Sequence, residues 1–127
     1  MLRLRFSPWP ALAVVTAGIC WLGVGAACAE EADPARGWAA LRAMDCARCH
    51  GREYRGWSAP SLLAAVRDAP RERFDRYVLE GDATRGMPGY RSQPLIVTEL
   101  DSIYAYLRAR SEGRVVDGLP ARSATGR

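Results

Sequence analysis

Two cysteines and a histidine form the most informative group in the sequence. Cys46 and Cys49 are separated by two residues, and His50 follows directly. This C-x-x-C-H pattern is typical of covalent haem attachment, in which both thiols form thioethers with haem vinyl groups and the imidazole ligates the iron. On a helical turn, the two intervening residues set the thiols at the separation of the vinyl groups. The pattern therefore predicts one covalently bound haem c, with its iron.

Three other interpretations of the cysteine pair compete with haem attachment. A redox dithiol is expected in a thioredoxin-like βαβ context, which does not surround this pair. A zinc site needs two more ligands, but no second cysteine pair follows and His50 is the only histidine in the chain. An inert pair of buried cysteines is the structural alternative.

The single histidine also limits the second axial ligand of the iron. If His50 binds one side, an imidazole cannot bind the other, and Met44 and Met87 are the thioethers outside the N-terminal segment. Met44 precedes Cys46 by two residues, on the wrong side of the attachment turn. Met87 lies in a Gly-Met-Pro-Gly-Tyr loop that two glycines and a proline allow to lie flat against a ring. This loop resembles that of class I cytochromes c, which implies Met87 as the second ligand; the alternative is a methionine that fills the core.

Residues 1–29 are typical of a secretory signal peptide. Two arginines lie near the start, an uncharged segment follows, and Ala27-Cys28-Ala29 matches the cleavage motif. We expect cleavage before Glu30 and therefore a periplasmic protein, because c-type cytochromes mature on that side of the inner membrane. An uncleaved membrane anchor and lipid attachment at Cys28 are the alternatives.

Charge gives little support for nucleic acid binding. The chain has 18 Lys and Arg residues against 14 Asp and Glu, a formal net charge of +4. Loss of the two leader arginines leaves 16 against 14, an excess that two haem propionates would cancel. Residues 30–113 are then one small domain whose core a haem would complete, and residues 114–127 form a tail without helical periodicity.

The helix signals predict an all-α fold with about four helices. Asp33 can cap a first helix that Pro34 begins. Ser61 can cap a short helix that runs through Arg67. Pro70 begins the next helix and Gly81 ends it. No alternation that would build a sheet is present.

The last helix has a start signal, an apolar stripe and a stop signal. Thr98 and Asp101 form a capping box that predicts the helix start, and Gly113 predicts its end. The apolar stripe has a period of 3.6 residues and consists of Leu100, Ile103, Tyr104 and Leu107.

The segment after the haem pattern also resembles class I cytochromes c. Ala-Pro-Ser-Leu at 59–62 matches their Pro-x-Leu. The resemblance implies that the Pro60 carbonyl accepts the imidazole N–H of His50 and fixes the ring. It also implies that Leu62 packs against the haem.

Three large side chains precede this segment. Tyr54, Arg55 and Trp57 carry the N–H and O–H donors that haem propionates need when they are buried. They are candidate haem contacts, with simple exposure at the surface as the alternative.

The resemblance to class I cytochromes c covers roughly residues 34–110. Besides the motifs above, Tyr106-Leu107 is similar to the Tyr-Leu near the end of the family's last helix. Gly37-x-x-x-Leu41 is similar to the Gly-x-x-x-aromatic pattern of its first helix, although a leucine replaces the aromatic residue. The family fold wraps helices around one haem, with the first and last helices crossing.

The resemblance implies a one-electron carrier rather than an enzyme. Methionine and histidine would fill both axial positions and raise the reduction potential. A periplasmic dehydrogenase would donate electrons, with a terminal oxidase or another cytochrome as acceptor. The last helix is similar to that of small cytochromes that accompany quinoprotein alcohol dehydrogenases. An open-site haem protein (peroxidase or gas sensor) and a fixed subunit of a larger redox enzyme are the alternatives.

Overall fold

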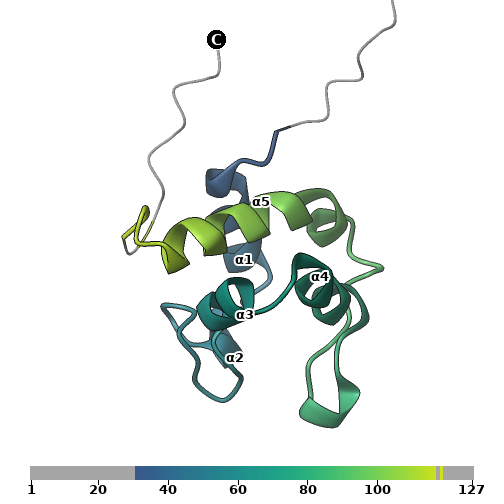
Figure 1. The fold of residues 1–127 in the computed structure, drawn as a ribbon. Coiled ribbons are helices and arrows are strands. Elements are labelled where there is room, and N and C mark those ends of the chain that lie inside the picture. The colour runs from purple at the N-terminus through teal and green to yellow at the C-terminus, as the bar shows by residue number, and fades with distance from the viewer. Residues whose placement is uncertain (1–30, 117, 119–127) are drawn as a thin grey trace, which may run out of the picture.

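The computed structural model describes residues 31–116 and 118 as a helical bundle without named strands (Figure 1). The elements in chain order are α1 (Pro34–Ala43), α2 (Ala47–His50), α3 (Leu62–Asp68), α4 (Arg71–Glu80), the 3-10 helix η1 (Ala83–Arg85) and α5 (Pro94–Ser111). The expected all-α class is confirmed, with five α-helices in the described part rather than about four. The expected signal peptide and most of the tail lie outside the described residues. None of the described helices is long and apolar enough to cross a membrane.

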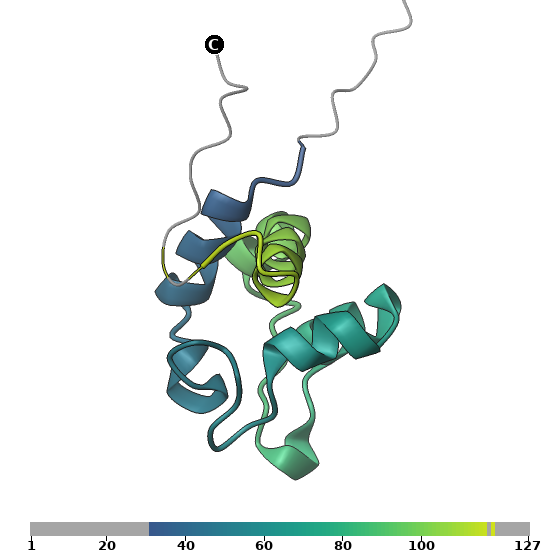
Figure 2. The same cartoon turned by 60° about the vertical axis from the view of Figure 1, so that its left-hand side comes forward.

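Helices α1 and α5 make the most extensive helix contact of the described chain, and both views show them crossing (Figures 1 and 2). The crossing is close because Gly37 faces the backbone of α5. A Cβ atom on Gly37 would lie 2.0 Å from the carbonyl oxygen of Ser102. Beside it, the backbone N–H of Asp33 donates to the hydroxyl of Ser102. The expected crossing of the first and last helices is therefore present.

The bounds of α1, α3 and α4 follow the sequence closely. Asp33 caps α1 by accepting from the N–H of Ala35 at 2.8 Å, and Pro34 is the first helical residue. Ser61 caps α3 by accepting from the N–H of Ala64. Pro70 and Gly81 bound α4 as expected.

The predicted capping box of the last helix is wrong. Helix α5 begins at Pro94, four residues before Thr98, and Gln93 precedes it without a side-chain cap. Proline suits a first helical position because the backbone N–H that it lacks would have no partner within the helix there. Thr98 is thus an exposed residue inside the helix, and Asp101 forms an ion pair with Arg71 of α4.

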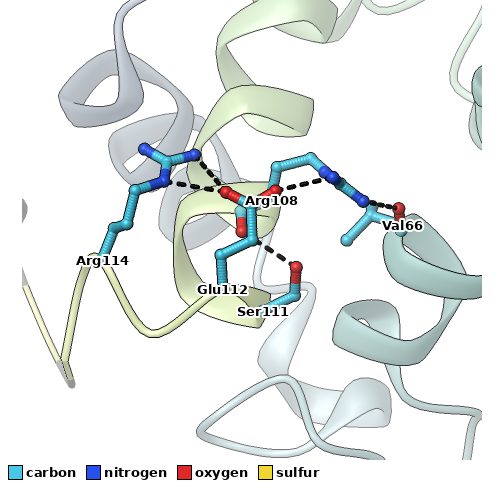
Figure 3. Close-up of polar contacts among 5 residues, drawn as sticks. All are labelled: Val66, Arg108, Ser111, Glu112 and Arg114. Atoms are coloured by element: carbon cyan, nitrogen blue, oxygen red, sulfur yellow. Dashed lines mark hydrogen bonds and ion pairs between the residues drawn. The ribbon is translucent and has the colours of Figure 1, made fainter.

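The C-terminal turn of α5 is attached to α3 and to the segment that follows α5 (Figure 3). Arg108 donates to the carbonyl oxygen of Val66 at 2.9 Å and to the carboxylate of Glu112 at 2.6 Å. Arg114 donates to the same carboxylate, and Ser111 donates to the carbonyl of Arg108. These contacts hold α3, together with the loop that precedes it, against α5.

The core lies where α5 meets α1 and α3. Tyr106 and Leu107 are fully buried at the crossing, and Val66 of α3 is almost as deeply buried. The apolar stripe predicted for the last helix is confirmed, because Ile103 and Leu107 are buried and Leu100 and Tyr104 pack beside them.

Candidate haem site

The C-x-x-C-H pattern forms a single helical turn that is connected directly to α1. The N–H of Cys46 donates to the carbonyl of Leu41, and the N–H of His50 donates to the carbonyl of Cys46. Both cysteines are free thiols; Cys46 is half-buried and Cys49 is exposed. Burial raises the pKa of Cys46 to about 11, with smaller contributions from the charges of Asp45 and Cys49. The Cys46 thiol is therefore protonated at neutral pH.

His50 is buried, and a carbonyl fixes its ring. Nδ1 of His50 lies 2.7 Å from the carbonyl oxygen of Pro60. Because a carbonyl can only accept, Nδ1 donates the proton of this bond, and Nε2 is the ring nitrogen left to face a metal ion. The contact that the family resemblance implied is present.

The loop between His50 and Pro60 turns back on itself around Tyr54. The N–H of Gly56 donates to the carbonyl of His50 at 2.9 Å. The carbonyl of Tyr54 accepts from the N–H of Leu62 at 3.0 Å and from the hydroxyl of Ser61 at 3.2 Å. Tyr54 thus links the loop to the start of α3, which brings the Pro60 carbonyl to His50.

Met87 lies in a loop whose two ends are joined. Asp82 and Met87 form an antiparallel bridge, with backbone bonds of 2.9 and 3.0 Å. The backbones of Gly81 and Gly89 approach so closely that a Cβ on Gly81 would lie 2.5 Å from the nitrogen of Gly89. The N–H of Tyr90 then donates to the carbonyl of Val78 in α4. The loop that carries the thioether is therefore attached firmly to the C-terminal end of α4.

His50 and Met87 line the same cleft. Two adjoining cavities of about 500 and 490 Å³ share His50, Leu62, Phe74 and Met87 in their walls. Volumes of this size fall within the range of cofactor sites, about 300–1,000 Å³. The cleft is lined mostly by apolar groups, as a flat aromatic cofactor requires.

The two cavities differ in their remaining walls. We call the one lined by Cys46, Cys49 and Ile103 the cysteine half. We call the other the α4 half, since Arg73 and Tyr77 of α4 line it while neither cysteine does. Both thiols are therefore at one side of the cleft.

The structure brings most of the predicted site residues together, but not all. Cys46, Cys49 and His50 line the cleft with Met87, and Pro60 and Leu62 also contribute to its walls.

Tyr54 and Trp57 do not line either half. Tyr54 is buried against Tyr106, with the ring centroids 6.3 Å apart. The side chain of Trp57 is 84% exposed. We therefore do not carry these two residues into the proposed site.

Several cleft residues were not identified from the sequence as cofactor contacts. Phe74, Tyr77 and Val78 are spaced at i, i+3 and i+4 on α4, and the face that they share lines the cleft. Arg73 and Arg85 are exposed residues, and both also contribute to the walls. The signal available was the spacing of Arg73 and Tyr77, four residues apart on α4 and hence on one side.

The residues present fit a covalently bound haem. Two free thiols lie at one side of an apolar cleft, and an imidazole with its Nδ1 proton engaged and a thioether line the same space. Within residues 31–116 and 118, no three His, Cys, Asp or Glu side chains gather as a separate metal-ion site.

The fold and this cleft define a small class I cytochrome c. The family model described as "Cytochrome C oxidase, cbb3-type, subunit III" matches residues 32–107, more than half of the chain. The chain belongs to this cytochrome c family. Its cofactor is accordingly covalently bound haem c with its iron.

Two known proteins are similar to the chain. Cytochrome c-555 of Methylococcus capsulatus (strain ATCC 33009 / NCIMB 11132 / Bath) is 29% identical over 83 residues, which cover 65% of this chain and 66% of that protein. The crystal structure of the c-type cytochrome XoxG from Methylobacterium extorquens AM1 matches with a TM-score of 0.63 and 24% identity. That match covers 70% of this chain and 57% of XoxG, and it shows the fold alone.

Proposed function

We propose that the protein is a periplasmic one-electron carrier in which residues 30–113 hold a single haem c. Cys46 and Cys49 would form the thioethers, and His50 and Met87 would be the axial ligands. The observation that carries this proposal is the convergence of these four side chains on one apolar cleft. When bound, haem c supplies an iron that alternates between the ferric and ferrous states.

The protein contributes a rigid environment for that iron. The hydrogen bond from His50 to the Pro60 carbonyl holds the imidazole in one orientation and makes it a better donor. The bridge between Asp82 and Met87 and the close approach of Gly81 and Gly89 hold the thioether loop in place. A thioether ligand and a buried cofactor favour the ferrous state and so raise the reduction potential.

The proposed partners are a periplasmic dehydrogenase as donor and a terminal oxidase or another cytochrome as acceptor, each docking transiently. A quinoprotein alcohol dehydrogenase is the donor that the sequence of the last helix suggests.

A second candidate is a fixed subunit of a larger redox enzyme. It is favoured by the matching family, whose description names an oxidase subunit. Size-exclusion chromatography of the protein released from the periplasm distinguishes the two. A soluble monomer supports the carrier, whereas co-elution with a larger complex supports the subunit.

The test of the proposed site is covalent haem retention. The unaltered protein should keep its haem through denaturing electrophoresis, as followed by the peroxidase stain of the haem. Cys49→Ala should show at most one thioether in the pyridine haemochrome spectrum, and His50→Ala should not mature normally. Ser92→Ala, an exposed position beyond the Met87 loop, is the control. Covalent haem at the normal level and spectrum in Cys49→Ala would contradict the proposal.

A further inference from the structure

The positions of the two cysteines distinguish one half of the cleft from the other. Both thiols line the cysteine half, and neither lines the α4 half. In haem c, the two carbons that form thioethers lie on one side of the macrocycle and the two propionates on the other. If the cysteines attach haem as proposed above, the propionate side of the molecule faces the α4 half.

The α4 half offers two hydrogen-bond donors suited to a carboxylate. Arg73 and Tyr77 line it from α4, with the guanidinium carbon of Arg73 5.9 Å from the centre of the Tyr77 ring. No hydrogen bond or ion pair engages the Arg73 guanidinium or the Tyr77 hydroxyl among the described residues. A guanidinium and a phenol on adjacent turns can donate to the same anionic group.

The other charged groups of this half are engaged with each other. Asp68 of α3 is held by Arg67 through two bonds, of 2.6 and 2.8 Å. Asp82 accepts from the hydroxyl of Thr84 at 2.6 Å and pairs with Arg85 at 3.6 Å. The bond to Arg67 lowers the pKa of Asp68, and the bond to Thr84 lowers that of Asp82, so both are carboxylates at neutral pH. An added carboxylate therefore needs its own cation here, and Arg73 is the basic residue of these walls without an acidic partner.

We propose that Arg73 and Tyr77 bind a haem propionate, and that this subsite replaces the contacts expected of Tyr54 and Trp57. The proposal rests on the proposed function, since it needs haem attached at Cys46 and Cys49. Arg73 would then bind that carboxylate and neutralise its charge.

Helix α4 supplies a matched control. The guanidinium carbon of Arg76 is also 5.9 Å from the centre of the Tyr77 ring, but Arg76 does not line the cleft. Arg73 and Arg76 share a charge, a helix and an aromatic neighbour, so they differ mainly in their access to the cleft. Arg73→Gln and Arg76→Gln therefore separate a specific contact from a general loss of positive charge.

The experiment is a spectroelectrochemical titration of the holoprotein, with the midpoint potential measured against pH. A propionate that ionises lowers the potential, because its negative charge stabilises ferric iron. At a pH where the propionate is ionised in both proteins, Arg73→Gln should lower the potential. The same variant should move the pH of this fall upward by about one unit or more. Tyr77→Phe should move it in the same direction by less. Arg73→Lys should retain much of the unaltered behaviour, and Arg76→Gln should match the unaltered protein.

The outcomes distinguish this proposal from the proposed function. If the unaltered protein holds covalent haem with a reversible potential but Arg73→Gln and Arg76→Gln give the same curve, the subsite is wrong and the electron carrier stands. If the unaltered protein holds no covalent haem, both are overturned. A selective shift in Arg73→Gln and Tyr77→Phe supports the subsite.

Discussion

The close crossing of α1 and α5 makes the replacement of Gly37 by alanine a sharp test of the fold. Helix propensity alone predicts that Gly37→Ala stabilises the protein by about 0.5–1 kcal/mol. The structure predicts the opposite. The new Cβ would lie 2.0 Å from the Ser102 carbonyl oxygen and 2.6 Å from the backbone nitrogen of Ile103, whereas ordinary contacts are 3.4–4 Å.

The clash involves backbone on both sides, so no side chain can rotate to relieve it. The helices must separate, which loosens the packing of Leu41, Tyr106 and Leu107. Overpacking of this kind typically costs about 1–3 kcal/mol. We expect Gly37→Ala to lower the free energy of unfolding by about 2 kcal/mol or more, since the clashing atoms cannot move independently.

The assay is guanidinium unfolding of the holoprotein, followed by circular dichroism at 222 nm. Ala39→Gly is the matched control, because Ala39 is an exposed residue of the same helix. It should lose only about 0.5–1 kcal/mol through propensity. A Gly37→Ala variant as stable as the unaltered protein, or more stable, would refute the close crossing.

Three further predictions concern the ligand loop and the buried tyrosine. Met87→Ala should keep covalent haem but lower the midpoint potential and allow carbon monoxide to bind ferrous iron; an unchanged potential would remove Met87 as a ligand. Gly89→Ala should weaken the loop, because its Cβ would lie 2.6 Å from the Glu80 carbonyl oxygen, and carbon monoxide binding measured optically should rise from none to partial; complete resistance would contradict the role of the loop ends. Burial raises the pKa of Tyr54 to about 12 from an ordinary value of 10.0. The unfolded protein therefore loses the Tyr54 proton at a lower pH than the folded protein does, so the free energy of unfolding should fall as pH rises from 10 towards 12. Tyr54→Phe should lessen that fall in denaturant titrations at pH 9 and 11, and equal falls in both proteins would exclude Tyr54 as its source.

The parts of the fold that local signals determine were predictable from the sequence. Asp33 and Pro34 start α1, Ser61 caps α3, and Pro70 and Gly81 bound α4, because caps and helix breakers act on adjacent backbone. The start of α5 was not predicted, since a capping-box match at Thr98 outweighed a proline that suits the first helical position.

The candidate site was predictable where short spacing in the chain brings its residues together. Cys46, Cys49 and His50 share one turn, and Met87 was the remaining thioether in a suitable loop. The side chains that form the walls of the cleft were not predictable, because their positions depend on tertiary packing. Tyr54 packs against Tyr106 and does not line the cleft, whereas Arg73 lines it from α4.

The optical spectrum of the purified protein tests the central claim most directly. In the ferric state, a thioether sulfur on the iron gives a weak charge-transfer band in the red. We predict that this band is present and that carbon monoxide leaves the ferrous spectrum unchanged, as expected when His50 and Met87 fill both axial positions. Absence of the band, together with carbon monoxide binding, would contradict a closed electron-transfer site and favour an open-site haem protein.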